Sequence, residues 1–386
     1  MKNVLILSTA ESTGGAAIAA SRLLAALQSQ HQSVSMMVRD GSSSNPSVHA
    51  IPYIWWRKAW ERAVILSWNG FFKDKLWQMD IANTGFDLLR HPLYCQTDVI
   101  HLHWINQGFL SLRTIREILL SGRRIIWTLH DQWPYTGICH YAGECSRFRS
   151  SCQRCPLLHT PGVNDLSHSI FLKKKEVYSS GKITFVGCSR WIAEEARGSA
   201  LLEGQHIVSI PNPIPSSIFH PMDRAEARRR HRLPQDKPIV MFCSQKVSDE
   251  RKGFAYLQQA LRLLPKVHLL VVGEGGRSVS SPEEMASLYA AADVFVTPSL
   301  QDNLPNTIAE AMSVGTPCVG FRVGGIPEMI DHLRNGFVAT PRQAESLAEG
   351  IRYVLSHDLR SEAAATAAAT YNEVSVAQQY MRLYNE

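Results

Sequence analysis

The chain has 386 residues, more than the ~250–300 residues that one hydrophobic core usually supports, so we expect two or three domains. Hydrophobic residues make up 45% and charged residues 19% of the chain, which excludes a disordered protein, a collagen-like repeat and a disulfide scaffold. Lys and Arg outnumber Asp and Glu by 40 to 34, for a formal net charge of +6. An excess of this size suits an anionic substrate or an anionic membrane surface but does not require nucleic acid.

The start of the chain, Met1–Leu7, has too short an apolar core for a signal peptide. No apolar run reaches the ~18 residues that a membrane-spanning helix needs. We therefore expect a cytoplasmic protein. Its eight cysteines are then expected to be thiols or metal ligands rather than disulfides.

In the first half of the chain, short β-branched runs alternate with helical segments. Strands are predicted at 4–7, 34–38, 99–103, 125–129, 183–186 and 207–210, and helices at 16–28 and 112–120. This alternation is typical of a doubly wound parallel α/β sheet.

A segment with three prolines and two serines, Ile210–Ser217, then predicts a linker. The alternation resumes with strands expected at 239–243, 268–272, 294–297 and 317–321, and helices at 254–264, 282–292, 306–314 and 344–355. The domains predicted are 1–210, a hinge at 211–222, 223–370, and a C-terminal helix at 371–386 that packs back on the first domain. Because ligands bind at the carboxyl ends of such strands, we expect the active site in a cleft that the two domains face.

Two features of the first domain are candidates for binding. Gly14 and Gly15 follow the first strand and open a helix, where the backbone can approach a ligand and the helix N-terminus favours an anion. A plain strand-to-helix turn explains these glycines equally well, and the dinucleotide pattern G-x-G-x-x-G is absent. His130 is expected at a strand's carboxyl end, where it could bind a sugar or a leaving group, although a lone histidine is more often structural.

Two lysines, Lys246 and Lys252, share the loop after the first strand of the second domain. Such a pair can clamp a diphosphate and neutralise the charge that develops as it leaves. A solvated charged loop is the alternative.

The segment from Pro298 to Met312 carries the most specific signal. A polar loop leads into a helix whose first N–H groups and dipole favour an anion. Glu310 lies about one turn into this helix, where its carboxylate could accept both hydroxyls of a ribose. Asp302 lies eight residues earlier, near the expected place of a sugar attached to the diphosphate.

With these residues the chain resembles glycosyltransferase family 4, whose members have the GT-B fold. The matches are spread over nearly the whole chain and comprise Gly14-Gly15, His130, Asn212, Lys246 and Lys252, Gly273-Glu274-Gly275, Asp302 with Glu310, and the segment from Gly324 to Glu328. More narrowly, Trp127–Trp133, the following Thr136-Gly137 and a cysteine cluster resemble bacterial exopolysaccharide transferases of the colanic-acid type.

The resemblance implies a retaining transferase that moves a hexose from a nucleotide-diphosphate sugar to a glycan or lipid-linked acceptor in polysaccharide biosynthesis. It implies no metal or other cofactor for catalysis. By position, Glu310 would bind the ribose, and Lys246 and Lys252 the diphosphate. His130 would contact the donor sugar near the reacting carbon. Asp302 would stand where the family usually has the first Glu of its E-x7-E pair.

The candidate catalytic residues are therefore His130, Asp302 and Lys252. The donor-binding set adds Gly15, Lys246, Asn303, Leu304, Pro305, Asn306, Thr307 and Glu310, while Gly14 and Gly15 are assigned to the acceptor side. The connection from Gly276 to Pro282 is shorter than in the family, so a strand and loop that usually touch the nucleobase are expected to be missing.

Four cysteines, Cys139, Cys145, Cys152 and Cys155, lie close together in the loop 136–160. Four thiolates at short spacing can close a tetrahedral structural zinc site. Free thiols or a redox C-x-x-C pair are the alternatives. The other cysteines, Cys95, Cys188, Cys243 and Cys318, are expected in the core.

The segment Tyr53–Trp68 mixes tryptophans with basic residues, as interfacial amphipathic helices do. A helix with its tryptophans in the core remains equally open. The first interpretation predicts a peripheral contact with the inner face of the plasma membrane. Three other functions stay open: a nucleotide-sugar hydrolase or epimerase on the same fold, a non-enzymatic zinc-stapled binding protein, and an inactive relative. No nucleic acid partner is expected.

Overall fold

The computed structural model describes residues 2–41, 44–52 and 54–386. The chain forms two compact units. The first comprises the chain up to Ile210 together with Ala377–Glu386, and the second comprises Pro211–Val376. Each unit is an α/β layer structure with its own parallel sheet, so the predicted fold class is confirmed.

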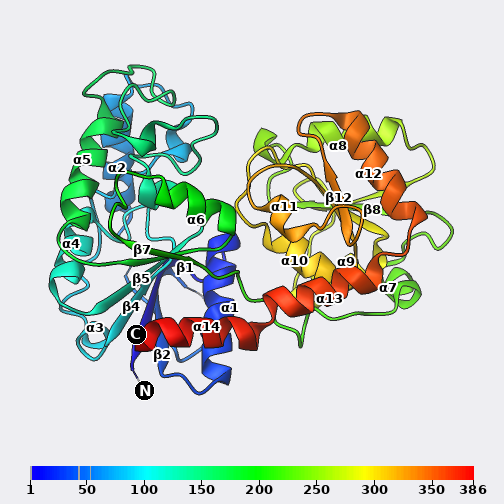
Figure 1. Ribbon diagram of the computed structural model, residues 1–386, viewed down its shortest axis with the longest axis horizontal. Helices are drawn as coiled ribbons and strands as arrows, with labels where there is room; N and C mark the ends of the chain where they lie inside the picture. The colour runs from blue at the N-terminus through cyan, green and yellow to red at the C-terminus, as the bar shows by residue number, and fades with distance from the viewer. Residues whose placement is uncertain (1, 42–43, 53) are drawn as a thin grey trace. The chain divides into compact units, whose positions relative to one another are not determined.

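The sheet of the first unit has the strand order β3-β2-β1-β4-β5-β6-β7, and Figure 1 shows this sheet with the helices of the unit around it. Its strands are β1 (Val4–Ala10), β2 (Val34–Asp40), β3 (Val48–Ala50), β4 (Val99–Leu102), β5 (Arg124–Leu129), β6 (Thr184–Gly187) and β7 (His206–Ser209). Val4 of β1 pairs in parallel with Val34 on one side and Val99 on the other. The strand order therefore reverses between β1 and β4, which makes their carboxyl ends a topological switch point.

Helices cover this sheet. They are α1 (Gly15–Ser29), α2 (Trp55–Trp68), α3 (Pro92–Cys95), α4 (Leu112–Leu120), α5 (Leu166–Tyr178) and α6 (Arg190–Arg197), with short 3-10 turns η1 (Leu76–Gln78), η2 (Trp133–Tyr135) and η3 (Arg147–Arg149). Ser111, Asp165 and Ser189 cap α4, α5 and α6 by accepting a backbone N–H from the first turn. The last helix, α14 (Glu373–Asn385), packs its end on this unit, where the Tyr384 hydroxyl lies 2.8 Å from Nδ1 of His101.

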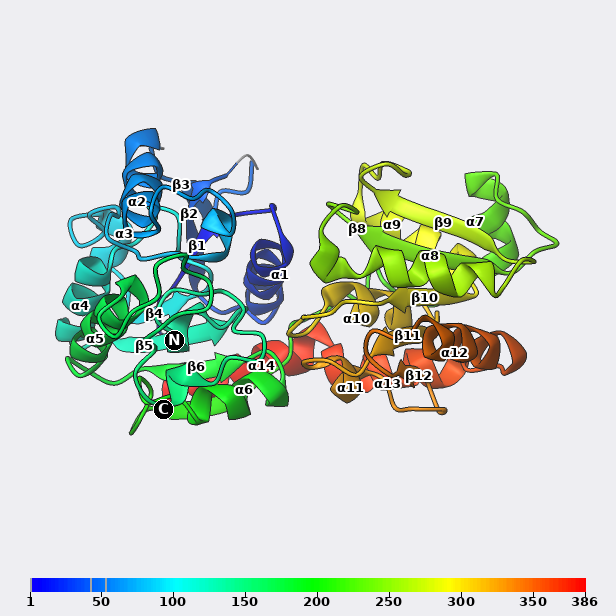
Figure 2. The ribbon, with the colours of Figure 1, turned by 90° about the horizontal axis from the view of Figure 1, so that it is seen from above.

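The sheet of the second unit has the order β12-β11-β10-β8-β9, as Figure 2 shows from above. Its strands are β8 (Ile239–Ser244), β9 (His268–Gly273), β10 (Val294–Thr297), β11 (Cys318–Phe321) and β12 (Gly336–Ala339). Its helices are α7 (Arg224–His231), α8 (Phe254–Arg262), α9 (Pro282–Ala291), α10 (Asn306–Ser313), α11 (Ile326–Met329), α12 (Ala344–Ser356) and α13 (Arg360–Tyr371), with the 3-10 turn η4 (Glu250–Lys252). Leu257 of α8 and Leu347 and Ile351 of α12 share one core with the sheet. The strand order reverses between β8 and β10, so the switch point lies there.

The edge strand β9 passes directly into α9 through residues 274–281, and no further strand forms in this fully described stretch. Instead, Arg277 folds back on β9, and its N–H donates to the carbonyl of Val271 at 2.9 Å. The connection is therefore a tight turn at the edge of the sheet.

Two expectations about burial are wrong. One interpretation of residues 53–68 was a helix with its tryptophans in the core. The tryptophans are not in the core: Trp55, Trp56, Trp60 and Trp68 are exposed. Tyr53 lies outside the described residues. Cys95 is also exposed, because it lies in the last turn of the short surface helix α3.

In the part of the chain that the structure describes, no helix combines the length and the apolar character that crossing a bilayer requires.

Candidate functional site

Two loops leave the carboxyl ends of β8 and β10, the strands that flank the switch point of the second unit. Gly253 ends the first loop with φ 68°, and a Cβ atom there would lie 1.8 Å from the carbonyl oxygen of Pro298 on the second. Only glycine allows this close approach. Leu300 donates its N–H to the carbonyl of Arg251 at 2.7 Å, and the Arg251 guanidinium donates to the carbonyl of Gln301 at 3.0 Å. The two loops are thus held against each other.

An ion pair joins the same two loops. Nζ of Lys252 lies 2.8 Å from Oδ2 of Asp302, which also accepts from the Ser299 hydroxyl at 3.3 Å. Burial alone would raise the pKa of Asp302, but the Lys252 ammonium, the Arg251 charge and these hydrogen bonds hold that pKa below its ordinary value. The structure therefore brings together two of the three candidate catalytic residues, as an ionised pair.

The helix α10 begins beside Asp302. Asn303, Leu304 and Pro305 are buried in the approach to it, and Asn303 accepts the N–H of Gly325 at 2.8 Å. Among the described residues no side chain caps this helix, whose N-cap is Pro305. Its uncapped first turn carries the two half-buried residues Asn306 and Thr307. An uncapped helix N-terminus presents N–H groups and a positive dipole end to an anion.

The hinge residue Asn212 fixes the start of α10. Its side-chain amide donates to Oδ1 of Asn306 at 2.9 Å. Asn212 was one of the residues on which the family resemblance rested, and this hydrogen bond explains why an asparagine suits that position.

Glu310 is buried one turn into α10, where Oε2 accepts the hydroxyl of Tyr289 at 2.9 Å. The thiol of Cys243 lies near the end of β8. Burial, with a smaller effect from the Glu310 charge, raises the pKa of Cys243 to about 12, and Lys252 acts in the opposite direction. The carboxylate and the ammonium therefore both act on one thiol at the switch point. Asp302, Lys252, Glu310 and the first turn of α10 thus all lie on the segments that follow β8 and β10.

The other candidate lysine lies apart from this pair. Lys246 is exposed and its carbonyl accepts the Ser244 hydroxyl at 2.8 Å. Hydrogen bonds from Ser248 lower the pKa of Glu274, and the Lys246 charge contributes to that shift. The loop that carries Lys246 therefore lies beside Glu274, which follows β9.

In the first unit, Gly14 is the N-cap of α1 with φ 92°, and a Cβ there would have no described atom within 4 Å. Left-handed backbone with open space beside it matches a turn that leaves room for a ligand. Gly15 is the first residue of the helix.

His130 follows β5 directly. Its Nε2 lies 2.8 Å from Nδ1 of His103, and its Nδ1 lies 3.5 Å from Sγ of Cys188. Burial lowers the pKa of His130 to about 4, although Asp131 acts against that shift. His130 is therefore neutral near pH 7. Nε2 of the buried His103 has no hydrogen-bond partner among the described residues.

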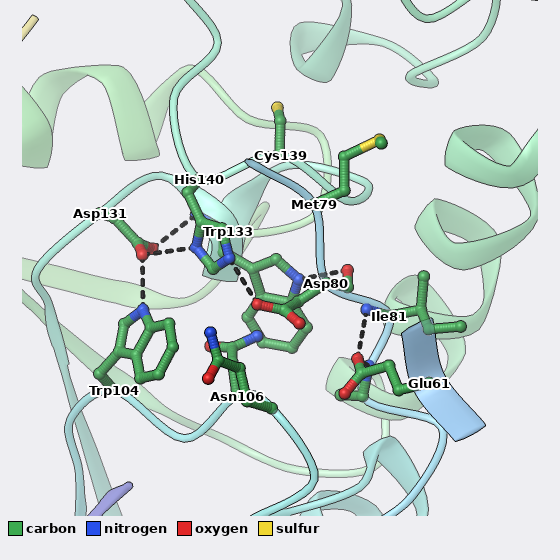
Figure 3. Close-up of polar contacts among 12 residues, drawn as sticks. Glu61, Met79, Asp80, Ile81, Trp104, Asn106, Asp131, Trp133, Cys139 and His140 are labelled. Atoms are coloured by element: carbon green, nitrogen blue, oxygen red, sulfur yellow. Dashed lines mark hydrogen bonds and ion pairs between the residues drawn. The ribbon is translucent and has the colours of Figure 1, made fainter. Parts of the chain in front are cut away.

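Next to His130 lies a buried charged network that the sequence did not indicate (Figure 3). His140 bridges two carboxylates, with Nδ1 2.6 Å from Oδ2 of Asp131 and Nε2 2.6 Å from Oδ2 of Asp80. Asp80 also pairs with Arg62 of α2, and Trp104 donates its ring N–H to Asp131 at 2.8 Å. Burial would raise the pKa of Asp131, but His140 and these donors hold it below its ordinary value. Only the position of Asp131 beside His130 could have signalled this network, because Asp80 is distant in sequence.

The four clustered cysteines Cys139, Cys145, Cys152 and Cys155 line one pocket of the first unit. Burial raises the pKa of Cys139, Cys152 and Cys155, and neighbouring thiols of the cluster add to each shift. In kind and number these donors fit zinc. As placed, however, no three His, Cys, Asp or Glu side chains among the described residues could hold a metal ion. The zinc site stays a prediction.

Part of the second unit is similar to a known protein family. Residues 237–357 match the family model of glycosyl transferases group 1. This range contains Lys246, Lys252, Asp302 and Glu310, and both strands of the switch point. The second unit contains a glycosyltransferase group 1 domain.

Several curated proteins are similar to the chain. The glycosyl transferase WcaC of Escherichia coli (strain K12), named for colanic acid biosynthesis, is 22% identical over 261 residues, which cover 60% of this chain and 62% of WcaC. A D-inositol 3-phosphate glycosyltransferase of Mycobacteroides abscessus is 24% identical over 58% of this chain and 66% of that protein. The chain spans between about half and two thirds of the length of such relatives. The resemblance to glycosyltransferases, including those of the colanic-acid type, is confirmed.

Solved structures share the fold. Sucrose-phosphate synthase from Thermosynechococcus elongatus has a TM-score of 0.70 at 19% identity and covers 100% of this chain and 98% of its own. HepE of Anabaena, solved in complex with UDP-glucose, has a TM-score of 0.65 at 14% identity and covers 100% of both chains. The fold is therefore GT-B, as the resemblance implied.

Proposed function

We propose that this protein is a glycosyltransferase whose glycosyltransferase group 1 domain binds a nucleotide-diphosphate sugar at the β8–β10 switch point. One observation carries the proposal: the ion pair of Lys252 and Asp302, the uncapped first turn of α10 and the buried carboxylate of Glu310 all lie on the segments that follow β8 and β10. N–H groups and an ammonium suit a diphosphate, and a buried carboxylate suits a ribose diol.

The chemistry follows from these charges. Lys252 stabilises the negative charge that develops on the departing diphosphate. Asp302 holds that ammonium in place and, since it is ionised, can also accept a hydrogen bond from a sugar hydroxyl. The neutral imidazole of His130 suits contact with a hydroxyl of the donor sugar. We propose transfer with retention of configuration and without a catalytic metal, and we assign no covalent nucleophile.

The donor and acceptor classes are further parts of the proposal. HepE was solved with UDP-glucose, which makes a UDP-hexose the first donor to test. The colanic acid relative supports a glycan or lipid-linked oligosaccharide as acceptor, in polysaccharide biosynthesis. A lipid-linked acceptor would be met in the cytoplasm at the inner face of the plasma membrane. Proton NMR of the new anomeric centre tests retention, since an inverted product would contradict it.

Calorimetric titration with UDP, GDP and ADP tests the nucleotide site. Glu310→Gln keeps the shape of the side chain but removes the charge that would accept two ribose hydroxyls. We expect the affinity for the preferred nucleotide to fall about tenfold to a hundredfold, as for losing hydrogen bonds to a charged group. Glu349→Gln, an exposed change on α12 of the same unit, is the control and should bind like wild type. Equal affinity for all three proteins would contradict the ribose role of Glu310.

Product analysis separates transfer from hydrolysis and epimerisation. A transferase consumes the nucleotide-sugar much faster when acceptor is present and attaches the sugar to it. Equal release of free sugar with and without acceptor would favour the hydrolase, and a changed sugar stereocentre the epimerase.

A further inference from the structure

Helix α2 has an unusual distribution of side chains. It buries the charged residues Glu61 and Arg62 together with Ile65, while Trp55, Trp56 and Trp60 lie 69%, 52% and 57% exposed. A surface helix normally does the reverse, with its apolar face toward the core. The exposed face of α2 is therefore the aromatic one.

The buried charges explain how the helix is held. Oε1 of Glu61 accepts the N–H groups of Ile81 and Ala82, both at 2.8 Å. Arg62 donates to the carbonyls of Leu76 and Met79 at 2.7 and 2.8 Å, besides its pair with Asp80. These contacts fix α2 on the first unit without using its tryptophans, so the tryptophans remain available.

The exposed aromatic face continues beyond the helix. We call the following residues the aromatic surface: Trp55, Trp56, Trp60, Trp68, Phe71, Phe72 and Trp77. Every exposed Trp and Phe among the described residues belongs to it. Figure 2 shows α2 at the edge of the first unit. Seven large aromatic side chains exposed within residues 55–77 favour an interaction site there.

The charges around the aromatic surface identify the partner. Lys73 and Lys75 are exposed, and Arg57 and Lys58 are half-buried beside Trp56 and Trp77, with cation–ring distances of 6.0 and 5.2 Å. The single exposed acid in the described residues from 54 to 78 is Asp74, whose carboxylate lies 2.6 Å from Nε2 of His159. Tryptophan and phenylalanine flanked by cations suit the interface of an anionic bilayer, where indole rings sit at the headgroup level.

We propose that the aromatic surface docks the first unit on an anionic lipid bilayer. This inference deepens the proposed function, because a lipid-linked acceptor would be met at that bilayer. The chain of contacts from Arg62 through Asp80 and His140 to Asp131 ties α2 to the segment that follows His130. Docking by α2 would therefore hold that segment at a fixed orientation to the lipid headgroups.

Vesicle binding tests the proposal without any sugar donor. We expect the protein to float with vesicles containing phosphatidylglycerol, much less with pure phosphatidylcholine, and to be released by salt. Lipids brominated on their acyl chains should quench its tryptophan fluorescence. Trp56→Ser/Trp60→Ser should weaken binding about tenfold or more, and Lys73→Glu/Lys75→Glu should remove the preference for anionic lipid.

The matched control is Leu120→Ser/Leu172→Ser, which removes two exposed apolar side chains elsewhere on the same unit and should bind like wild type. Three results would overturn the proposal: no binding of wild type to anionic vesicles, binding without quenching, or equal binding by Trp56→Ser/Trp60→Ser. If wild type instead forms a dimer that the tryptophan substitutions dissociate, and does not bind vesicles, then the aromatic surface is an interface with a second copy of this chain. If the protein binds nucleotide normally but does not bind vesicles, the result contradicts the membrane inference alone and does not affect the proposed function.

Discussion

At the scale of single residues, the pairing of Lys252 with Asp302 determines what either can do. Two residues that the sequence singled out separately, one for a diphosphate and one for a sugar, hold each other in place at 2.8 Å. Because Asp302 is largely buried, its negative charge depends on that lysine. A phosphate group of a bound ligand would therefore contact the Lys252 ammonium, which the Asp302 carboxylate already holds in position.

This pairing predicts the effect of Lys252→Ala. The change leaves the Asp302 carboxylate without its main counter-charge, so we expect a loss of about 1–3 kcal/mol in unfolding free energy and much weaker nucleotide binding. The double change Lys252→Met/Asp302→Leu should recover stability but not binding. Denaturant unfolding and calorimetry measure the two effects, with the exposed Lys266→Ala as control. Wild-type binding by Lys252→Ala would contradict the diphosphate role.

The pair also sets a pH dependence. The pKa of Asp302 lies below its ordinary value of 3.8, so the folded state favours the ionised form. The stability from the pair is then complete above about pH 4 and is lost as the pH falls through the lowered pKa. In Asp302→Asn this acid loss should be smaller.

His140 offers a second prediction at this scale, with a built-in comparison. His140 bridges two buried carboxylates, whereas His159 faces Asp74 in a largely exposed pair. His140→Gln should cost about 2–4 kcal/mol of unfolding free energy, because Asp80 and Asp131 lose the group they share. His159→Gln should leave the unfolding free energy close to that of wild type, because solvent screens this exposed pair. Similar losses in both variants would show that the buried network does not stabilise the first unit.

At the scale of elements, the sequence predicted most strands and several helices correctly. The helix expected at 112–120 is α4, and those expected from 306 and 344 are α10 and α12. Buried parallel strands are continuous β-branched runs, which is why they could be recognised. The strand β12 was missed because Gly336–Ala339 has too few branched residues to stand out.

Helix α2 shows where periodicity fails as a guide. Its tryptophans and charged residues alternate with a helical period, but the period does not say which face is buried. Glu61 and Arg62 are buried because distant backbone groups and Asp80 satisfy them, and no local pattern reveals those partners. For the same reason the Asp80–His140–Asp131 network was invisible to sequence reasoning.

The cysteine-lined loop carries a prediction of its own. Its four thiols line one pocket, and four cysteines are the donor set of a structural zinc site. We propose about one structural zinc per chain, and we expect chelation to lower the melting temperature. Cys152→Ser/Cys155→Ser should abolish the metal, while Cys95→Ser on α3 should not. Metal-free protein with an unchanged melting temperature would reject the zinc site in favour of free thiols.

At the scale of the whole molecule, two separate parallel sheets could be predicted because the βαβ alternation stops at a proline-rich segment and restarts. The loops at the carboxyl ends of β8 and β10 were also within reach, since they carry Lys252, Asp302 and Glu310. The contacts between these two loops could not be predicted. Gly253 contacts Pro298 and Arg251 contacts Gln301, and in each case the two residues are far apart in the sequence. The residues that meet at the β8–β10 switch point could thus be predicted, but the pairing between them could not.

We propose that the switch point of the second unit binds a nucleotide diphosphate. Hydrogen–deuterium exchange with and without UDP, GDP or ADP at saturating concentration tests it most directly, because it reports where any nucleotide binds. We predict slower exchange in residues 244–253 and 298–312 with at least one nucleotide. Unchanged exchange in both segments with all three nucleotides, or protection confined to other segments, would contradict the account.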